Sequence, residues 1–259
     1  AKNLTPVTLE LGGKSPAIIS QDVPMQDAAT RIAFGKMLNA GQTCVAPDYV
    51  LLPEKRLQQF VETIQQTVNA FYPAIDDNPD YTAIINTRHR ARLQGLIDDA
   101  KAKGAQVITL YPESQDIRMP LTLLLNVNDD MDVMQQEIFG PILPIVTVKN
   151  IEQSIPFVNE RAKPLALYVF TKNSDFEQQV LNSTSAGMVC VNDGFMFAAN
   201  PNLPFGGVGN SGTGAYHGKI GFDNFSHLKT VMKRSFMFDV PLRYPPFTDK
   251  KFKLLKKMI

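Results

Sequence analysis

The sequence contains few cysteines and few histidines, and these shortages exclude several kinds of protein. Among 259 residues there are only two cysteines, Cys44 and Cys190, and three histidines. Two distant cysteines do not form the disulfide framework of a small secreted protein, so we expect a reducing, cytoplasmic compartment. The histidines, His89, His217 and His227, stand far apart in the sequence, so they give no metal-ligand spacing and no zinc site is expected.

Excess charge of one sign and long apolar runs are also lacking. Lys and Arg number 26 and Asp and Glu 25, which gives a formal net charge of +1. This balance predicts no electrostatic affinity for nucleic acid or for an acidic membrane. No apolar run reaches the roughly 18 residues that a membrane span needs. The basic tail 249–259 has too few apolar residues to act as a stable membrane anchor, so we expect it to form a solvated terminal helix.

The N-terminus has neither an initiator Met nor a signal-peptide pattern. The chain opens Ala1-Lys2-Asn3-Leu4, and a strand-like run at 7–11 follows almost at once. We therefore expect the chain to be part of a longer protein, about whose targeting the missing signal says little.

Hydrophobic periodicity predicts that strands and helices alternate along most of the chain. Apolar residues recur at helical spacing from Pro24 to about Leu38, in 54–72 and in 87–103, where Gly104 can end the helix. Strand-like runs lie at 7–11, 17–19, 106–110, 121–127, 142–148, 165–171 and 188–191. Near-continuous apolar strands separated by helices imply an α/β fold with a mostly parallel, doubly wound sheet flanked by helices.

Two later helices have recognisable capping residues. Asn150 can cap the helix that follows the run 142–148. Ser174, with Glu177 three residues later, has the spacing of a capping box and predicts a helix through Leu181.

A polar turn that carries Cys44 lies between a helix-like run and the strand-like run 49–52. Asn39 and Gly41 can adopt a positive φ, so the chain can stop its helix there and turn sharply. A cysteine on such a connection is a candidate nucleophile, although a free cysteine is also commonly a small buried hydrophobe.

Glycine is concentrated between Phe205 and Gly214, after a polar loop. A long glycine-rich loop inside a compact domain is more often functional than accidental. It lacks the Lys-Ser/Thr ending of a P-loop, so we interpret it as a place where backbone segments pack closely near a site.

Four stretches together resemble the catalytic, C-terminal half of the aldehyde dehydrogenase superfamily. They follow one another in the order and spacing typical of that family, and they are Leu9–Pro16, Gly41–Cys44, Gln136–Pro141, and Pro204–Gly207 with Asn210–Gly212. Closer details resemble the class 3 branch, which includes coniferyl, fatty and aromatic aldehyde dehydrogenases. These details are Cys44–Tyr49, Gly214–Lys219 and Arg243–Phe247.

The resemblance implies a role for five residues. Cys44 matches the nucleophile, whose thiohemiacetal transfers hydride to the nicotinamide and becomes a thioester. Glu10 matches the general base that activates the deacylating water. Glu137 matches the acid that binds the nicotinamide ribose, and Phe139 the ring that packs beside the nicotinamide. Phe205, in a Pro-Phe-Gly-Gly turn, is a candidate substrate-pocket residue.

The chemistry of these residue types suits such roles. A thiol is expected to be partly ionised near neutral pH and to leave readily from an acyl-enzyme. A carboxylate on an apolar strand, as expected for Glu10, would be desolvated and therefore a stronger base. We expect Lys14, Cys190 and His217 to be structural.

The resemblance also implies a cofactor, NAD or NADP, bound mainly by a Rossmann-type domain upstream of Glu10. We therefore expect this chain alone to bind NAD(P) poorly and to oxidise aldehydes slowly or not at all. Residues 1–227 would form the catalytic domain and 228–259 a C-terminal strand and tail. Leu228–Ser235 is the candidate strand for assembly, and a homodimer is usual in the class 3 branch.

Other readings remain open at this point. One is a cofactor-independent thiol esterase or acyl-transfer domain. The segment 137–139 is evidence against this function, because that segment has no purpose without a nicotinamide. Another is a non-catalytic structural relative, which has no reason to retain both Cys44 and Glu10. A coniferyl-type aromatic aldehyde and a medium- or long-chain aldehyde remain equally open as substrates, and so do NAD and NADP as cofactors.

Overall fold

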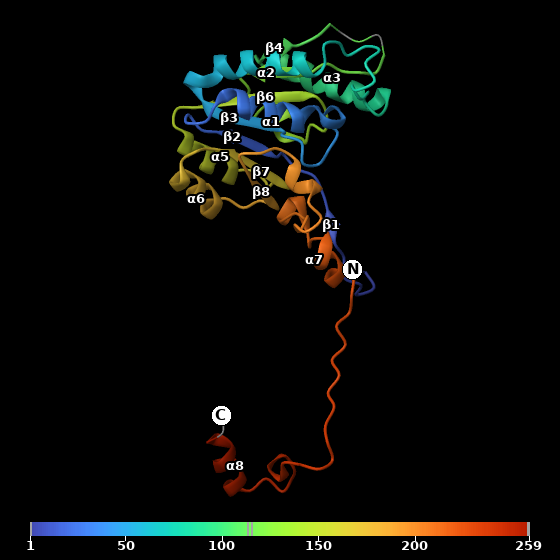
Figure 1. Ribbon diagram of the computed structural model, residues 1–259, viewed down its shortest axis with the longest axis vertical. Coiled ribbons are helices and arrows are strands. Elements are labelled where there is room, and N and C mark those ends of the chain that lie inside the picture. The colour runs from blue at the N-terminus through green and yellow to red at the C-terminus, as the bar shows by residue number, and fades with distance from the viewer. Residues whose placement is uncertain (1, 113, 115, 258–259) are drawn as a thin grey trace. The chain divides into compact units, whose positions relative to one another are not determined.

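The computed structural model describes residues 2–112, 114 and 116–257. These residues divide into two units, one that ends at Phe225 and one that begins at Ser226. The first unit is an α/β domain, and the second contains the helix α8 (Figure 1).

A seven-stranded sheet forms the centre of the first unit, in the order β4-β5-β6-β3-β2-β7-β8 (Figure 1). Its strands are β2 (Pro16–Ile19), β3 (Tyr49–Pro53), β4 (Gln106–Thr109), β5 (Thr122–Leu125), β6 (Ile142–Val148), β7 (Ala166–Phe170) and β8 (Met188–Val191). All neighbouring pairs are parallel except β4 and β5, which are antiparallel. The predicted, mostly parallel sheet is thus confirmed.

Helices cover both faces of this sheet. They are α1 (Met25–Met37), α2 (Leu57–Phe71), α3 (Thr87–Ala102), α4 (Asp132–Gln135), α5 (Ser154–Asn159) and α6 (Ser174–Ser183). A further helix, α7 (Gly218–Asn224), has no buried residue and does not cover the sheet. Successive side chains of a strand point to opposite faces. Ala17 and Ile19 accordingly pack with α1 and α2, whereas Ile18 packs with α3, α5 and α6. The sheet is therefore doubly wound, as predicted.

One of the two predicted helix caps is correct and the other is wrong. Asn150 stands at the N-cap position, its backbone N–H donates to the side chain of Gln153 (3.4 Å), and the 3₁₀ turn that begins there continues into α5. Ser174 is the first helical residue of α6 and not its cap, because Asn173 accepts the hydrogen bonds of the first free backbone N–H groups. Both residue types cap helices well, so the sequence alone does not distinguish them.

The glycine-rich loop packs backbone against backbone, as predicted. A Cβ atom at Gly207 would lie 2.1 Å from the carbonyl oxygen of Ser211. The loop then forms β9 (Gly212–Thr213), which pairs antiparallel with β1 (Leu9–Glu10). Gly207, Gly209 and Gly212 have the spacing of a dinucleotide-binding loop, but this loop does not lead from a strand into a helix, so it is no phosphate site.

In the second unit, α8 (Asp249–Lys256) is capped by Thr248, whose side chain accepts a hydrogen bond from the N–H of Lys251. Leu228–Ser235 forms no strand with the described residues of this chain, so its proposed part in assembly stays a prediction. None of the described helices is both long enough and apolar enough to cross a membrane.

We predict that Gly187→Ala lowers the free energy of unfolding by about 1–3 kcal/mol. Its Cβ atom would lie 2.3 Å from the carbonyl oxygen of Gly206 and 2.8 Å from that of Leu165, and backbone atoms cannot rotate away. Gly95 of α3 is the matched control, because a Cβ atom there meets nothing within 4 Å. Gly95→Ala should stabilise the chain by about 1 kcal/mol, through helix propensity. Urea denaturation measures both, and equal effects of the two changes would contradict the prediction.

Candidate active site

Three segments that precede parallel strands meet at the candidate site. Glu10 lies before β2, Cys44 before β3 and Glu137 before β6, and these strands are neighbours in the order β6-β3-β2. The site therefore lies at the amino-terminal edge of these strands. Open α/β sheets generally bind ligands at the carboxyl edge, so the topology alone would have placed the site wrongly.

The turn before Cys44 has the backbone that the sequence predicted. Asn39 has φ 53°, Ala40 φ 52° and Gly41 φ 72°, all in the left-handed region. A Cβ atom at Gly41 would lie 2.4 Å from the carbonyl oxygen of Gly140, just before β6. Glycine is therefore required both for the turn and for its contact with the next segment.

Two side chains, Gln42 of the turn itself and Tyr168 of β7, fix this turn to other parts of the chain. The amide of Gln42 donates to the carbonyl oxygen of Ala83 (3.1 Å) and accepts from the N–H of Ile85 (2.9 Å). From β7, the hydroxyl of Tyr168 donates to the carbonyl oxygen of Val45 (2.5 Å). The backbone on both sides of Cys44 is thus fixed.

Cys44 and Glu10 are in direct contact. The Sγ atom of Cys44 lies 3.7 Å from Oε1 of Glu10. Burial and the charge of Glu10, against a smaller opposing effect of the Cys44 backbone N–H, together raise the pKa of the Cys44 thiol to about 11. The expectation that Cys44 is partly ionised near neutral pH is therefore wrong for this chain. Near neutral pH the thiol is mostly protonated, with a carboxylate in contact that can accept its proton.

Glu10 itself is exposed on β1, so the desolvation expected from its apolar strand is not found. Its second oxygen, Oε2, accepts a hydrogen bond from the hydroxyl of Tyr216 (3.3 Å). Sequence reasoning missed Tyr216, because a tyrosine about 200 residues away has no local signal that points to Glu10.

Glu137 lies against the segment that follows Glu10. Its carboxylate accepts a hydrogen bond from the N–H of Gly13, and a Cβ atom at Gly12 would lie 1.8 Å from its Oε2. Burial, with a further contribution from the charge of Asp48, raises the pKa of Glu137 to about 7. Glu137 therefore changes its protonation state near neutral pH.

Helix α3 supports the backbone of the segment 137–139. Nε2 of His89 lies 2.8 Å from the carbonyl oxygen of Phe139, and the two rings make an edge-to-face contact with centroids 6.3 Å apart. Arg92 donates to the carbonyl oxygens of Glu137 (3.3 Å) and Ile138. Phe139 remains 38% exposed, so its side chain can contact a ligand.

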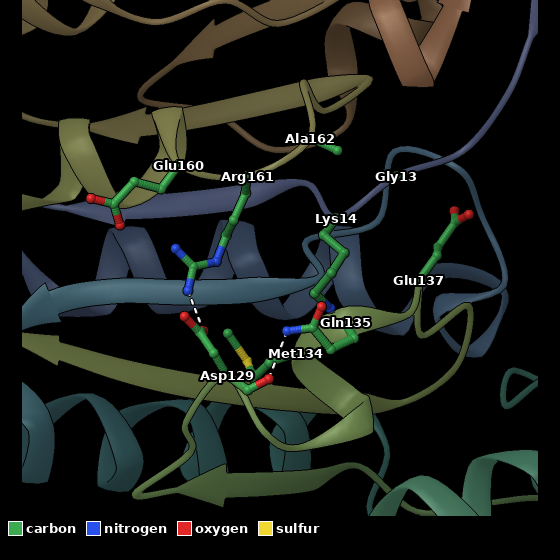
Figure 2. Close-up of a pocket in the computed structure, with 9 residues that line it drawn as sticks. All are labelled: Gly13, Lys14, Asp129, Met134, Gln135, Glu137, Glu160, Arg161 and Ala162. Carbon is green, nitrogen blue, oxygen red and sulfur yellow. Dashed lines mark hydrogen bonds and ion pairs between the residues drawn. The ribbon is translucent and has the colours of Figure 1, made fainter.

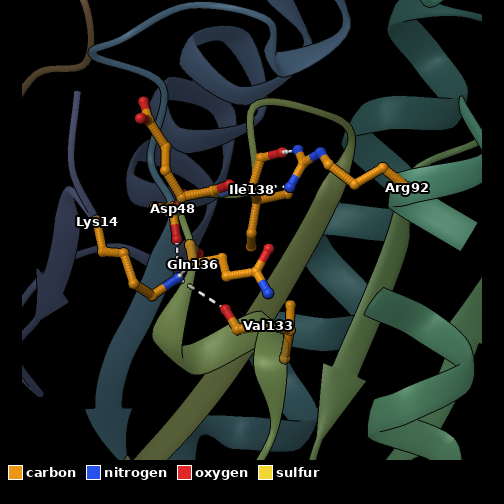
Figure 3. A network of polar contacts seen from close by, with 7 residues as sticks. Lys14, Asp48, Arg92, Val133, Gln136 and Ile138 are labelled. Carbon is orange, nitrogen blue, oxygen red and sulfur yellow. Dashed lines mark hydrogen bonds and ion pairs between the residues drawn. The ribbon is translucent and has the colours of Figure 1, made fainter. Parts of the chain in front are cut away.

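On the other side of the segment, Lys14 and Asp48 form a half-buried ion pair (Figure 3). Lys14 Nζ also donates to the carbonyl oxygen of Val133 (2.7 Å), and Asp48 Oδ2 accepts from the N–H of Ile138 (2.9 Å). Figure 3 shows Lys14 and Arg92 reaching this segment from opposite sides. Lys14 is thus structural, as predicted.

A pocket of about 360 Å³ lies beside Glu137 and Gly13 (Figure 2). Its two cations are already paired, Lys14 with Asp48 and Arg161 with Asp129. It therefore offers no unpaired cation for an anionic ligand. Among the described residues, no group of three His, Cys, Asp or Glu side chains could hold a metal ion.

Phe205 is buried, with 6% of its surface exposed. Its ring packs on Tyr216 (5.5 Å) and His217 (5.3 Å), and its backbone pairs with that of Tyr216. Phe205 thus supports Tyr216 from behind. That Phe205 lines a substrate pocket stays a prediction. Cys190 is half-buried against the core, in keeping with a structural role.

The carboxylate of Glu137 and the ring of Phe139 fit one end of a nicotinamide cofactor. A half-buried carboxylate is a suitable acceptor for ribose hydroxyls, and an exposed aromatic ring can pack on a planar heterocycle. Gly12 and Gly13 leave room for the carboxylate.

Comparison with known proteins adds independent information on this chain. Residues 1–231 match the sequence profile described as the aldehyde dehydrogenase family. The probable coniferyl aldehyde dehydrogenase of Pseudomonas aeruginosa is 54% identical over 258 residues, which cover 100% of this chain and 54% of that protein. Aldehyde dehydrogenase family 3 member A2 of Mus musculus is 49% identical over 255 residues, which cover 97% of this chain and 52% of that protein.

Solved structures are similar as well. The substrate-bound Staphylococcus aureus AldH superimposes with a TM-score of 0.92 at 42% identity, over 99% of this chain and 56% of that one. The NADP-dependent glyceraldehyde-3-phosphate dehydrogenase of Bacillus halodurans, solved with NADP, has a TM-score of 0.77 at 32% identity, over 84% of this chain and 46% of that one. The chain thus spans about half the length of the relatives that it matches.

We predict that Glu10→Gln lowers the pH midpoint of Cys44 alkylation by about one unit, because a like charge at short range is removed. Iodoacetamide labelling between pH 7 and 11, read by peptide mass, gives the midpoint. Cys190 is the internal control, because burial raises its pKa to about 11 as well, with Asp193 and not Glu10 as the neighbouring acid. An unchanged Cys44 midpoint, or an equal shift at Cys190, would contradict the assignment.

A second prediction concerns Lys36 of α1, which is 1% exposed. Burial lowers the pKa of Lys36 from 10.5 to about 8, against the attraction of Asp48. Between these values the unfolded chain binds more protons, so the stability contributed by this site rises with pH. The wild type should gain roughly 3 kcal/mol relative to Lys36→Met between pH 7 and pH 10.5.

The control is Lys101→Met, at an exposed lysine of α3. Its stability difference from the wild type should stay constant over the same pH range. Chemical denaturation at several pH values measures both differences, and parallel curves for the wild type and Lys36→Met would disprove the prediction.

Proposed function

The chain belongs to the aldehyde dehydrogenase family, and we propose that it is the catalytic half of an NAD(P)-dependent enzyme that oxidises an aldehyde to its carboxylic acid. The observation that carries this proposal is the contact between the Cys44 thiol and the Glu10 carboxylate, 3.7 Å apart. It places a nucleophile beside a base that can take its proton.

The proposed reaction has two stages. The Cys44 sulfur bonds to the carbonyl carbon while its proton passes to Glu10, and the thiohemiacetal then loses hydride to leave a thioester. NAD(P)⁺, held in part by Glu137 and Phe139, would supply the hydride acceptor. A water molecule next gives a proton to Glu10 and attacks the thioester, and the thiolate leaves as the acid is released.

The exposure of Glu10 supports its use in both stages. After the thiol proton reaches Glu10, that proton must leave before the same carboxylate can activate water. An exposed carboxylate exchanges its proton directly with solvent. Because of its raised pKa the Cys44 thiol is mostly protonated near neutral pH, and Glu10 can take the proton as the sulfur attacks.

Glu137 and Phe139 are proposed to hold the nicotinamide end of the cofactor. The rest of the cofactor would be bound by an upstream domain of the kind that the relatives' greater length allows. The NADP of the Bacillus halodurans structure supports a nicotinamide cofactor, and we leave NAD and NADP both open for this chain.

A coniferyl-type aromatic aldehyde is the substrate that we propose first, since a 54%-identical relative is named as a probable coniferyl aldehyde dehydrogenase. A medium- or long-chain aldehyde is the alternative. We also propose a cytoplasmic homodimer. A thiol esterase is less well supported, because ester hydrolysis does not require the segment 137–139, which His89 and Arg92 hold in place.

The test compares this chain with a protein that carries it behind an N-terminal nucleotide-binding half. The longer protein should oxidise coniferyl aldehyde with NAD(P)⁺, and Cys44→Ala should reduce kcat by about 10³-fold or more. The chain alone should be slow, because half of the cofactor site lies elsewhere. A near-normal rate for the chain alone would contradict the proposal, as would an active Cys44→Ala variant.

Cofactor affinity should rise with pH through neutrality in the longer protein. Below its pKa of about 7 Glu137 is protonated and a weaker acceptor for hydroxyl groups, and above it the carboxylate is ionised. Titration of NAD(P)⁺ by protein fluorescence between pH 5.5 and 8.5 should show this rise. Glu137→Gln should flatten the profile, and a variant that retains the full pH dependence would rule Glu137 out as its source.

A further inference from the structure

The two oxygens of Glu10 are bound by different partners. Oε1 faces Sγ of Cys44 at 3.7 Å, whereas Oε2 accepts the hydrogen bond of the Tyr216 hydroxyl at 3.3 Å. An exposed glutamate on a two-residue strand would otherwise rotate freely in water. The hydrogen bond from Tyr216 restricts this rotation.

The glycine-rich loop carries Tyr216 to this position. Its strand β9 pairs with β1, in the register Leu9 with Thr213 and Glu10 with Gly212. Gly214, with φ 81°, turns the chain beyond β9 against the side chain of Thr8. The loop thus contacts the segment that carries Glu10 both at Thr8 and along Leu9–Glu10. The proposed chemistry alone gives this loop no role.

The ring of Tyr216 is also held from behind. Phe205 packs on it and exchanges two backbone hydrogen bonds of 2.8 Å with it. His217 lies edge-on at 4.6 Å. The hydroxyl is therefore presented in a defined direction.

We propose that Tyr216 is a positioning residue that fixes Glu10 through Oε2, so that Oε1 is the oxygen directed at Cys44. This inference rests on the proposed function, in which Glu10 is the base. It divides the work between the two oxygens: one is held by the phenol and the other takes the proton of the thiol and later of water.

A phenol is suited to this task. Burial raises the pKa of Tyr216, and the charge of Glu10 raises it further, so the hydroxyl stays a donor throughout the pH range in which Glu10 works. The charged groups that act on Cys44 are Glu10 and Glu137, and only the first is in contact with Tyr216.

The test is a double-mutant cycle on Cys44 alkylation in the 259-residue chain, with iodoacetamide between pH 7 and 11. In Tyr216→Phe the released carboxylate turns toward water and repels the thiolate less. The alkylation rate at pH 8.5 should rise about two- to fivefold, as expected for the loss of one hydrogen bond. In a Glu10→Gln background the same change should have almost no effect, because no charge remains to be positioned.

The matched control is Tyr244→Phe. It removes another tyrosine hydroxyl that donates to a carboxylate, Asp239 at 2.6 Å, in the second unit. It should leave the Cys44 profile unchanged, and near-ultraviolet circular dichroism checks that each variant is folded.

Two outcomes would overturn the proposal. If Tyr216→Phe leaves the pH profile of Cys44 unchanged, Tyr216 does not hold Glu10. If it shifts the profile equally with and without Glu10, Tyr216 acts on Cys44 through packing alone. Neither outcome bears on aldehyde oxidation, which is measured separately, so the two proposals can fail independently.

Discussion

Close contact between backbone segments at glycine is the constraint on which the candidate site depends. Gly12 leaves room for the carboxylate of Glu137, and Gly41 meets the carbonyl oxygen of Gly140. Gly187, just before β8, lets the glycine-rich loop approach at Gly206. Gly207 lets the same loop fold back on itself at Ser211. Residues far apart in sequence thus come within hydrogen-bond distance without long side chains that would add flexibility.

The electrostatics of the site follow from this close assembly. Burial raises the pKa of Cys44 and of Glu137, and a neighbouring acid adds to each effect, Glu10 for Cys44 and Asp48 for Glu137. The cation Lys14 pairs with Asp48, and the buried Lys36 interacts electrostatically with Asp48 and Glu137. Protonation of one group therefore depends on its neighbours, as is common where proton transfer is required.

Much of the fold could be predicted from the sequence, because the strands are short continuous apolar runs. The bounds of 142–148 and 188–191 were predicted correctly for this reason. The turn at Asn39 and Gly41 followed from residue types that tolerate a positive φ. The cap of α6 was wrong because Asn173 and Ser174 are both good caps.

The candidate site was only partly predictable. Motif spacing pointed to Cys44, Glu10, Glu137 and Phe139, and the structure brings their segments together. Tyr216 and Lys36 were missed, because their importance arises from contacts between distant segments. The exposure of Glu10 was missed for a related reason: an apolar strand of two residues at the rim does not enclose its side chain.

The most direct test of the account is to trap the acyl group on Cys44. In Glu10→Gln, within a protein that includes the nucleotide-binding half, the thiol ionises more easily but water lacks its base. After mixing with coniferyl aldehyde and NAD⁺ and quenching in acid, the peptide that contains Cys44 should carry the acyl mass. Reduced cofactor formed while this peptide stays unmodified would contradict the central claim that Cys44 is the nucleophile.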